Sequence, residues 1–139
     1  MRTVKLSRHD LFPFDSRYAI YGAYVALTDV VPHTTTVRAS RTLAADERGQ
    51  VMSGYLFLMR KSAPTTAGVA TAFFDIQGHT LLADLSEITT AVGNARYVVV
   101  PAGAVIPAGH TIRLVTADAS TGGTYDYSLG YNIIVTSVV

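Results

Sequence analysis

The stretch YDYSLGYNIIVT, residues 125–136, decides the fold class of this chain. Apolar or aromatic side chains occupy every second position from Tyr125 to Val135, and mostly small or polar residues fill the positions between them. A period of two held over a dozen residues is typical of a β-strand with one buried face. The segment therefore predicts a long, half-buried strand near the C-terminus.

Upstream of this stretch the β pattern continues. Residues 50–60 (QVMSGYLFLMR) are apolar on both alternations, which predicts a central strand covered on both faces. Shorter β-like segments follow at residues 69–76, 80–85, 96–100 and 111–116, separated by turns rich in Gly and Pro. In the segment 80–85 the alternation places Leu81, Ala83 and Leu85 on one side. Six or more short strands at this spacing predict a sandwich or a barrel.

The first 50 residues carry a weaker signal. Three tyrosines at a spacing of three, Tyr18, Tyr21 and Tyr24, suit a helical stripe. Tyr, Ile and Val nevertheless prefer strands, and Gly22 disfavours a helix, so residues 17–27 are predicted to form a strand, with a helix as the alternative. Residues 43–48 are compatible with a single helical turn.

These segments together predict an all-β chain with a jelly-roll or β-sandwich of about eight strands. The length of 139 residues fits a single domain over residues 1–139. The densest β pattern covers residues 50–138, and residues 1–14 precede it as an N-terminal arm or extension.

Composition points to association. Hydrophobic residues make up 49% and charged residues 15% of the chain, against about 25% charged in an average domain. So few charges favour a surface that is buried against partners, with a polar exterior rich in Thr, Ser and Gly as the alternative. We expect a homo-oligomer, and specifically a dimer. No cysteine is present, which excludes disulfides and thiolate metal sites. No stretch has the apolar run of a signal peptide or a membrane span, so no membrane partner is expected.

The net charge of +1 hides an asymmetry between the two parts of the chain. Residues 1–62 hold nine basic and five acidic groups, a balance of +4, whereas residues 63–139 hold two basic and five acidic groups, a balance of −3. The cations are too dispersed for the clustered stripe that neutralises phosphates, so no nucleic acid partner is expected.

The residue types that act in catalysis or metal binding in other proteins form no recognisable catalytic pattern in this sequence. His79 and His110 each follow a glycine turn and begin a strand. Their side chains could bind the same metal ion only if the two turns lay side by side. The further ligands that a site needs are scarce, and the same residues suit hairpin turns. No nucleophile elbow or phosphate-binding loop occurs. We therefore expect no enzyme activity, no metal and no cofactor.

The tyrosines near the C-terminus have two interpretations. Tyr125, Tyr127 and Tyr131 share one strand face and would serve either as a sugar- or partner-binding platform or as a wall of the core. The core interpretation is favoured.

Three motifs carry a resemblance to a known family. These are the strand-turn-strand FDIQGHTL (residues 74–81), the turn and strand PAGHTIRL (residues 107–114), and the glycine pair at 122–123 before the long last strand. In this arrangement residues 51–138 resemble the β-sandwich modules of structural proteins of tailed bacteriophages. The chain as a whole, with its Tyr-rich N-terminal segment and small size, resembles the jelly-roll cement, or decoration, proteins of tailed-bacteriophage capsids. The resemblance implies a virion structural protein that binds the major capsid protein on the outer capsid surface, bridges capsomers, and is assembled in the host cytoplasm. It implies no catalytic residues.

The N-terminal arm is the predicted partner-binding segment. Its cations Arg2, Lys5 and Arg8 would steer the protein toward an acidic shell, and Phe12 and Phe14 would anchor it there. The alternative for this segment is an edge strand at residues 3–6 with both phenylalanines in the core. The alternative function for the whole chain is a carbohydrate- or receptor-binding module of a phage fibre.

Overall fold

The computed structural model describes residues 16–138, and its regular structure consists of strands only. The nine strands are β1 (Ser16–Val30), β2 (His33–Thr42), β3 (Glu47–Ser62), β4 (Ala70–Ile76), β5 (Thr80–Glu87), β6 (Ala95–Val99), β7 (Val105–Ile106), β8 (Thr111–Asp118) and β9 (Thr124–Val138). The all-β prediction is confirmed, with the two-residue β7 as the strand beyond the expected eight. Among the described residues no helix has the length and apolar character needed to cross a bilayer.

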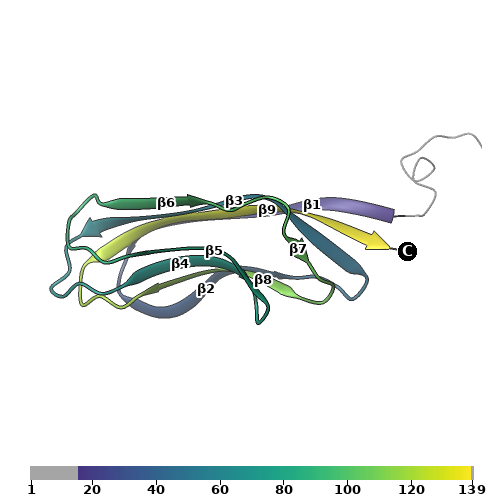
Figure 1. Cartoon of the computed structure of the whole chain (residues 1–139). Helices are drawn as coiled ribbons and strands as arrows, with labels where there is room; N and C mark the ends of the chain where they lie inside the picture. The colour runs from purple at the N-terminus through teal and green to yellow at the C-terminus, as the bar shows by residue number, and fades with distance from the viewer. Residues whose placement is uncertain (1–15, 139) are drawn as a thin grey trace, which may run out of the picture.

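The strands form two antiparallel sheets that pack face to face (Figure 1). One sheet has the order β1-β9-β3-β6, with β7 also paired to β3, and the other has the order β2-β8-β4-β5. The chain crosses repeatedly between the layers, and its first and last strands lie side by side. This strand order is that of a jelly roll, the double Greek-key sandwich.

β1 settles the ambiguity in the first 50 residues. The segment is a strand whose register with β9 runs unbroken from Ser16↔Val138 to Leu27↔Tyr127. Because side chains alternate along a strand, the tyrosines at a spacing of three separate: Tyr21 points toward the core, while Tyr18 and Tyr24 point outward. The helical stripe is therefore not formed, and β propensity decides the structure of this segment.

The core lies between the sheets and follows the alternation of β9. The residues predicted to face inward are all buried: Tyr125, Tyr127, Leu129, Tyr131, Ile133 and Val135. The ring of Tyr131 stacks on that of Phe74 from the opposite sheet, with centroids 5.1 Å apart and planes within 9°. The core interpretation of the C-terminal tyrosines is thus confirmed.

Two local predictions are wrong. β3 is central, but only one of its faces is fully buried, because no third layer formed by residues 16–138 covers the outer surface of its sheet. Residues 43–48 do not form the expected helical turn, because residues 44–47 make a β-turn that leads into β3. Glu47 donates its N–H to the carbonyl of Ala44 at 3.1 Å, and its carboxylate accepts the Ala44 N–H at 2.7 Å.

A β-bulge accounts for a third difference. The register between β4 and β5 shifts between Phe74 and Asp75, so that Leu81 lies opposite the outward-facing Asp75. Leu81 is consequently 56% exposed, whereas Leu85 on the other side of the shift is buried. A one-residue slip moves side chains to the opposite face, which the simple alternation of the sequence does not reveal.

Candidate functional site

The exposed tyrosines gather on the outer surface of the β1-β9-β3-β6 sheet. Directly opposed residues of an antiparallel pair share a face, so the register places Tyr24, Gly130, Tyr55 and Val99 in one row across four strands. The adjacent row holds Ala26, Ser128, Phe57 and Tyr97.

We refer to this surface as the tyrosine face. It comprises Ile20, Gly22, Tyr24 and Ala26 of β1, Ser128, Gly130, Asn132 and Ile134 of β9, Ser53, Tyr55 and Phe57 of β3, and Tyr97 and Val99 of β6. None of these side chains is charged.

Three rings cross the tyrosine face as a ladder. The centroid of Tyr55 lies 6.4 Å from that of Tyr24 and 6.3 Å from that of Tyr97, and the planes of Tyr55 and Tyr97 are within 24° of each other. The Tyr55 hydroxyl is hydrogen-bonded to Ser128 Oγ at 3.1 Å, which fixes the middle ring. The outer two rings are largely open to solvent, with Tyr24 68% and Tyr97 63% exposed. Ordered aromatic rings with exposed faces suit binding to a partner or a ligand.

A shallow depression of about 360 Å³ lies beside the ladder. Gly22 and Gly130 contribute to its lining, and Asn132 Nδ2 donates to Ser53 Oγ at 3.1 Å along it. A Cβ at position 130 would lie only 2.8 Å from Cε1 of Tyr55. Glycine at position 130 therefore lets the Tyr55 ring lie flat across the strand.

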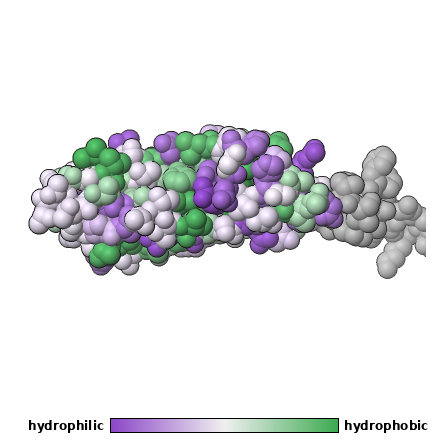
Figure 2. Space-filling view, turned by 90° about the horizontal axis from the view of Figure 1, so that it is seen from below, coloured by the Kyte–Doolittle hydropathy of each residue, from purple (hydrophilic) through white to green (hydrophobic). Residues whose placement is uncertain are grey.

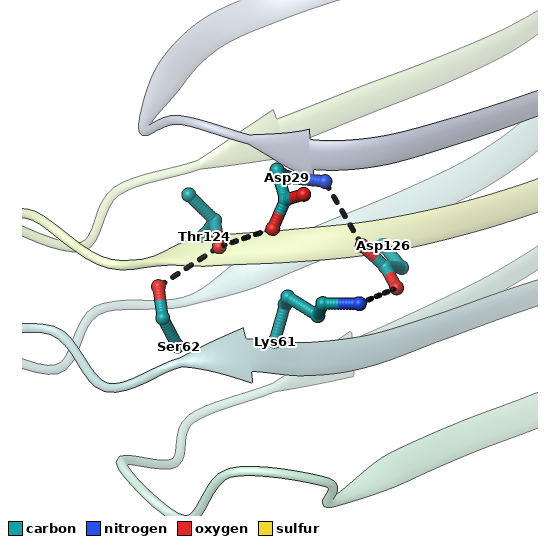
Figure 3. A network of polar contacts seen from close by, with 5 residues as sticks. All are labelled: Asp29, Lys61, Ser62, Thr124 and Asp126. Atoms are coloured by element: carbon teal, nitrogen blue, oxygen red, sulfur yellow. Dashed lines mark hydrogen bonds and ion pairs between the residues drawn. The ribbon is translucent and has the colours of Figure 1, made fainter.

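Charged groups bound the tyrosine face at one end (Figure 3). Asp126 accepts the backbone N–H of Asp29 at 2.9 Å and pairs with Lys61 at 3.7 Å. Thr124 links the same group by hydrogen bonds to Asp29 and Ser62. Asp29 has a positive φ of 53°, and the regular pairing of β1 with β9 is interrupted beside it. The network thus marks where the uncharged surface stops.

The outer surface of the β2-β8-β4-β5 sheet is different in character. Figure 2 shows this face as a mixture of hydrophilic and hydrophobic residues. Arg113 donates two hydrogen bonds to the Asp75 carboxylate, at 3.0 and 2.7 Å, and this contact raises the pKa of the guanidinium. Neighbouring outward positions hold Ser, Thr and Asp residues as well as the apolar Phe73, Val37 and Leu81. The two outer surfaces of the sandwich are therefore not equivalent.

The partner-binding residues predicted from sequence, Arg2, Lys5, Arg8, Phe12 and Phe14, lie outside the described residues, so their role stays a prediction. The tyrosine face was not anticipated. Its signal in the sequence is the uncharged alternation from Tyr18 to Thr28, which becomes readable only once this segment is known to be a strand.

The two glycine-turn histidines are neighbours. The rings of His79 and His110 meet edge to face with centroids 5.2 Å apart. Within residues 16–138, however, no group of three or more His, Cys, Asp or Glu residues is placed to hold a metal ion. The pair alone supplies too few ligands for a typical site.

A buried polar cluster occupies one end of the core. Arg60 is fully buried, lies 3.7 Å over the Tyr125 ring, and donates to Ser120 Oγ at 3.0 Å and to the Thr89 carbonyl at 3.2 Å. The carboxylates of Glu87 and Asp118 are also buried. Burial raises the pKa of the Tyr127 and Tyr125 hydroxyls, neither of which has a hydrogen-bond partner among the described residues. The cluster is closed to solvent, so we assign it a structural role.

No protein-family model matches the sequence, and no curated protein matches it either. Among solved structures, a chain of Desmodium yellow mottle tymovirus is similar at 9% identity with a TM-score of 0.45, covering 89% of each chain. A chain of infectious bursal disease virus, Gx strain, is similar at 16% identity with a TM-score of 0.40, covering 88% of this chain and 32% of that one.

A third similarity is to dimeric latent PorU from Porphyromonas gingivalis, at 12% identity with a TM-score of 0.49, covering 86% of this chain and 13% of that one. No function is transferred from these structures. The jelly-roll assignment rests on the strand order of the chain itself.

Proposed function

We propose that this chain is a virion structural protein that binds the outer surface of a capsid shell through its tyrosine face and stabilises the shell by bridging capsomers. The partner is the major capsid protein. Jelly rolls are frequent in viral capsid proteins and in lectins, and the resemblance of the sequence to phage decoration proteins supports the first of these uses. Fold alone does not specify a function, so the proposal depends on the surface.

The observation that carries the proposal is the uncharged, aromatic outer surface of one sheet. Tyrosine is enriched at protein interfaces and charged residues are depleted at their centres. The tyrosine face has both properties, while the opposite outer surface has an Arg113–Asp75 ion pair and many small polar groups. The low charged fraction of 15% agrees with a protein that works in contact with others.

The size of the surface suits a specific contact. Four strands at about 4.8 Å spacing and roughly nine residues at about 3.4 Å rise span roughly 600 Å². A typical specific interface hides about 800 Å² per partner. One tyrosine face approaches this area, and we propose that the N-terminal arm, with Arg2, Lys5, Arg8, Phe12 and Phe14, contributes the rest.

The test uses particles that lack this protein and purified full-length chain. Tyr24→Ser combined with Tyr97→Ser removes two rings that are more than 60% exposed, so folding should be retained. We expect binding to the shells to weaken at least about tenfold, since loss of hot-spot aromatic residues costs about 2 kcal/mol or more. Val37→Ser, which removes an exposed apolar side chain from β2 in the other sheet, is the control. Wild-type affinity in the double variant would overturn the assignment of this face.

A second function is favoured by the depression beside the ladder. Sugar rings stack on exposed aromatic faces, and Asn132 and Ser53 offer hydrogen-bonding groups at the same place. A fibre-type carbohydrate- or receptor-binding module would use these features. Binding of the isolated protein to a glycan array, lost in the Tyr24→Ser, Tyr97→Ser variant, together with no affinity for bare shells, would favour this alternative over the capsid role.

A further inference from the structure

β1 is an open sheet edge with unusual properties. Among residues 16–138 it pairs with β9 on one side only, and it is the longest edge strand of the two sheets. From Tyr18 to Thr28 its sequence, YAIYGAYVALT, contains no charged residue and no proline. Proteins normally protect such edges with charges, prolines, bulges or short length, because unpaired backbone groups recruit another strand.

The other edge strands among the described residues have that protection, and β7 is only two residues long. β2 carries Arg38 and Arg41 and two irregularities in its register with β8. β5 carries Asp84 and a bulge against β4, and β6 is five residues long and includes Arg96. Among the described residues, β1 is therefore the edge best suited to pairing.

We propose that two copies of this chain pair through antiparallel β1 edges around a twofold axis, forming one continuous ten-stranded sheet of five strands from each copy. The sequence predicts self-association but leaves the surface open, and the structure assigns it to this edge. The proposal goes beyond the capsid role and does not depend on it.

The side chains of β1 are complementary to those of a second copy. Antiparallel partners must share a face, so outward residues pair with outward residues. In the register that sets Ala23 opposite its own counterpart, large residues meet small ones: Tyr24 lies opposite Gly22, Ile20 opposite Ala26, and Leu27 opposite Ala19. The same large-small pairing already exists within the chain, where Tyr24 lies opposite Gly130 of β9.

Pairing with a second copy also gives a reason why the tyrosine face extends to the β1 edge of its sheet. Tyr24 and Ile20 are 68% and 57% exposed and stand beside the open strand. Edge pairing would join two tyrosine faces into one surface of roughly 1,200 Å². Such a surface would span two neighbouring binding sites on a larger assembly.

The test measures mass by sedimentation in dilute solution without any shell, so its result is separate from the capsid role. Wild-type protein should be a dimer at tens of micromolar. Ile20→Lys combined with Ala26→Lys places like charges directly opposite each other in the proposed register, and should give a folded monomer with the far-UV circular dichroism spectrum of the wild type. Both positions are exposed, so the fold does not need them.

A charge-swapped variant controls for nonspecific effects of the lysines. Ile20→Lys combined with Ala26→Glu places opposite charges in contact across the axis, and should restore the dimer. Deletion of residues 1–14 should leave the dimer intact. The proposal is overturned if the wild type is a monomer, if the double-lysine variant remains a dimer, if the charge-swapped variant stays monomeric, or if the deletion abolishes the dimer, which would make the N-terminal segment the contact.

Discussion

Arg60 of β3 contacts Tyr125 of β9, Ser120 after β8 and Thr89 after β5, and so connects the two sheets at one end of the core. The sequence pattern of β3 does not reveal these contacts. The Arg60 side chain lies in an apolar alternation yet is fully buried, with its guanidinium over Tyr125 and hydrogen-bonded to Ser120 and Thr89. Its charge and those of the buried Glu87 and Asp118 all act on the pKa of the Tyr125 hydroxyl, which burial raises. A buried cation near buried carboxylates offsets their desolvation.

Removal of this cation should therefore be costly. Arg60→Ala is expected to lower the free energy of unfolding by about 3–5 kcal/mol, because it leaves a cavity in the core and removes two hydrogen bonds and the contact with the Tyr125 ring. Denaturant unfolding measures the loss. The neighbouring Lys61→Ala is the control, because Lys61 is 45% exposed in its pair with Asp126 and should contribute less than about 1 kcal/mol. Equal losses in the two variants would contradict a structural role for the cluster.

The buried tyrosines predict a specific response to alkaline pH. Burial raises the pKa of Tyr127, Tyr125 and Tyr131, with the charges of Asp118 and Tyr125 adding to the effect at Tyr127. An unfolded tyrosine releases its proton near pH 10, whereas the folded chain retains it. Stability is thus fully present below about pH 10 and decreases as the pH rises beyond that value.

The measurement is the melting temperature as a function of pH. It should fall steadily above about pH 10 in the wild type. The fall should be shallower in Tyr127→Phe, which removes one of the raised groups and whose hydroxyl has no partner among the described residues. An identical pH profile in the variant would show that Tyr127 does not contribute.

At the scale of single strands, the close packing of β9 against β3 shapes the tyrosine face. A Cβ at position 130 would approach Tyr55 Cε1 to 2.8 Å and the Ala23 carbonyl oxygen to 3.3 Å. Gly130→Ala should displace the Tyr55 ring and break its hydrogen bond to Ser128, at a cost in stability of about 1–3 kcal/mol. Shell binding should weaken about tenfold, since the middle rung of the ladder moves.

A small substitution elsewhere gives the comparison for this variant. Ser86→Ala changes an exposed residue of β5 on the other sheet and should leave binding unchanged. If Gly130→Ala binds as well as Ser86→Ala does, the arrangement of the ladder is unimportant to recognition.

The sequence predicts a strand and its buried face correctly where a single signal, such as hydrophobic alternation, dominates. β9 alternates without interruption, so its buried face, including Tyr125, Tyr127 and Tyr131, followed directly. In β1 the tyrosine spacing and the residue propensities disagreed, and propensity prevailed because β9 provides a pairing partner along the whole strand.

The errors arise where tertiary structure decides. The bulge that turns Leu81 outward depends on the register with β4, and the exposure of one face of β3 depends on the number of layers. Neither is encoded in local alternation. The tyrosine face is built from four strands that are distant in sequence, so only the strand order brings Tyr24, Tyr55 and Tyr97 together.

For the molecule as a whole, the uncharged contact surface predicts weak salt dependence. Exposed charges are screened beyond about 8 Å at physiological ionic strength, but the tyrosine face has none to screen. Shell binding by a chain lacking residues 1–14 should change less than about threefold between low and high salt, while any steeper dependence in the full chain should come from Arg2, Lys5 and Arg8. A tenfold loss with salt in the truncated chain would assign the contact to charges on the sandwich instead.

The central claim is that this jelly roll binds a shell by its tyrosine face. The most direct measurement is electron microscopy of the particle that co-purifies with the chain from its native source. The account predicts a closed shell with the chain on its outer surface and with Tyr24, Tyr55 and Tyr97 against the major capsid protein. A particle in which the chain is part of a fibre, or lies on the shell with the tyrosine face toward solvent, would contradict it.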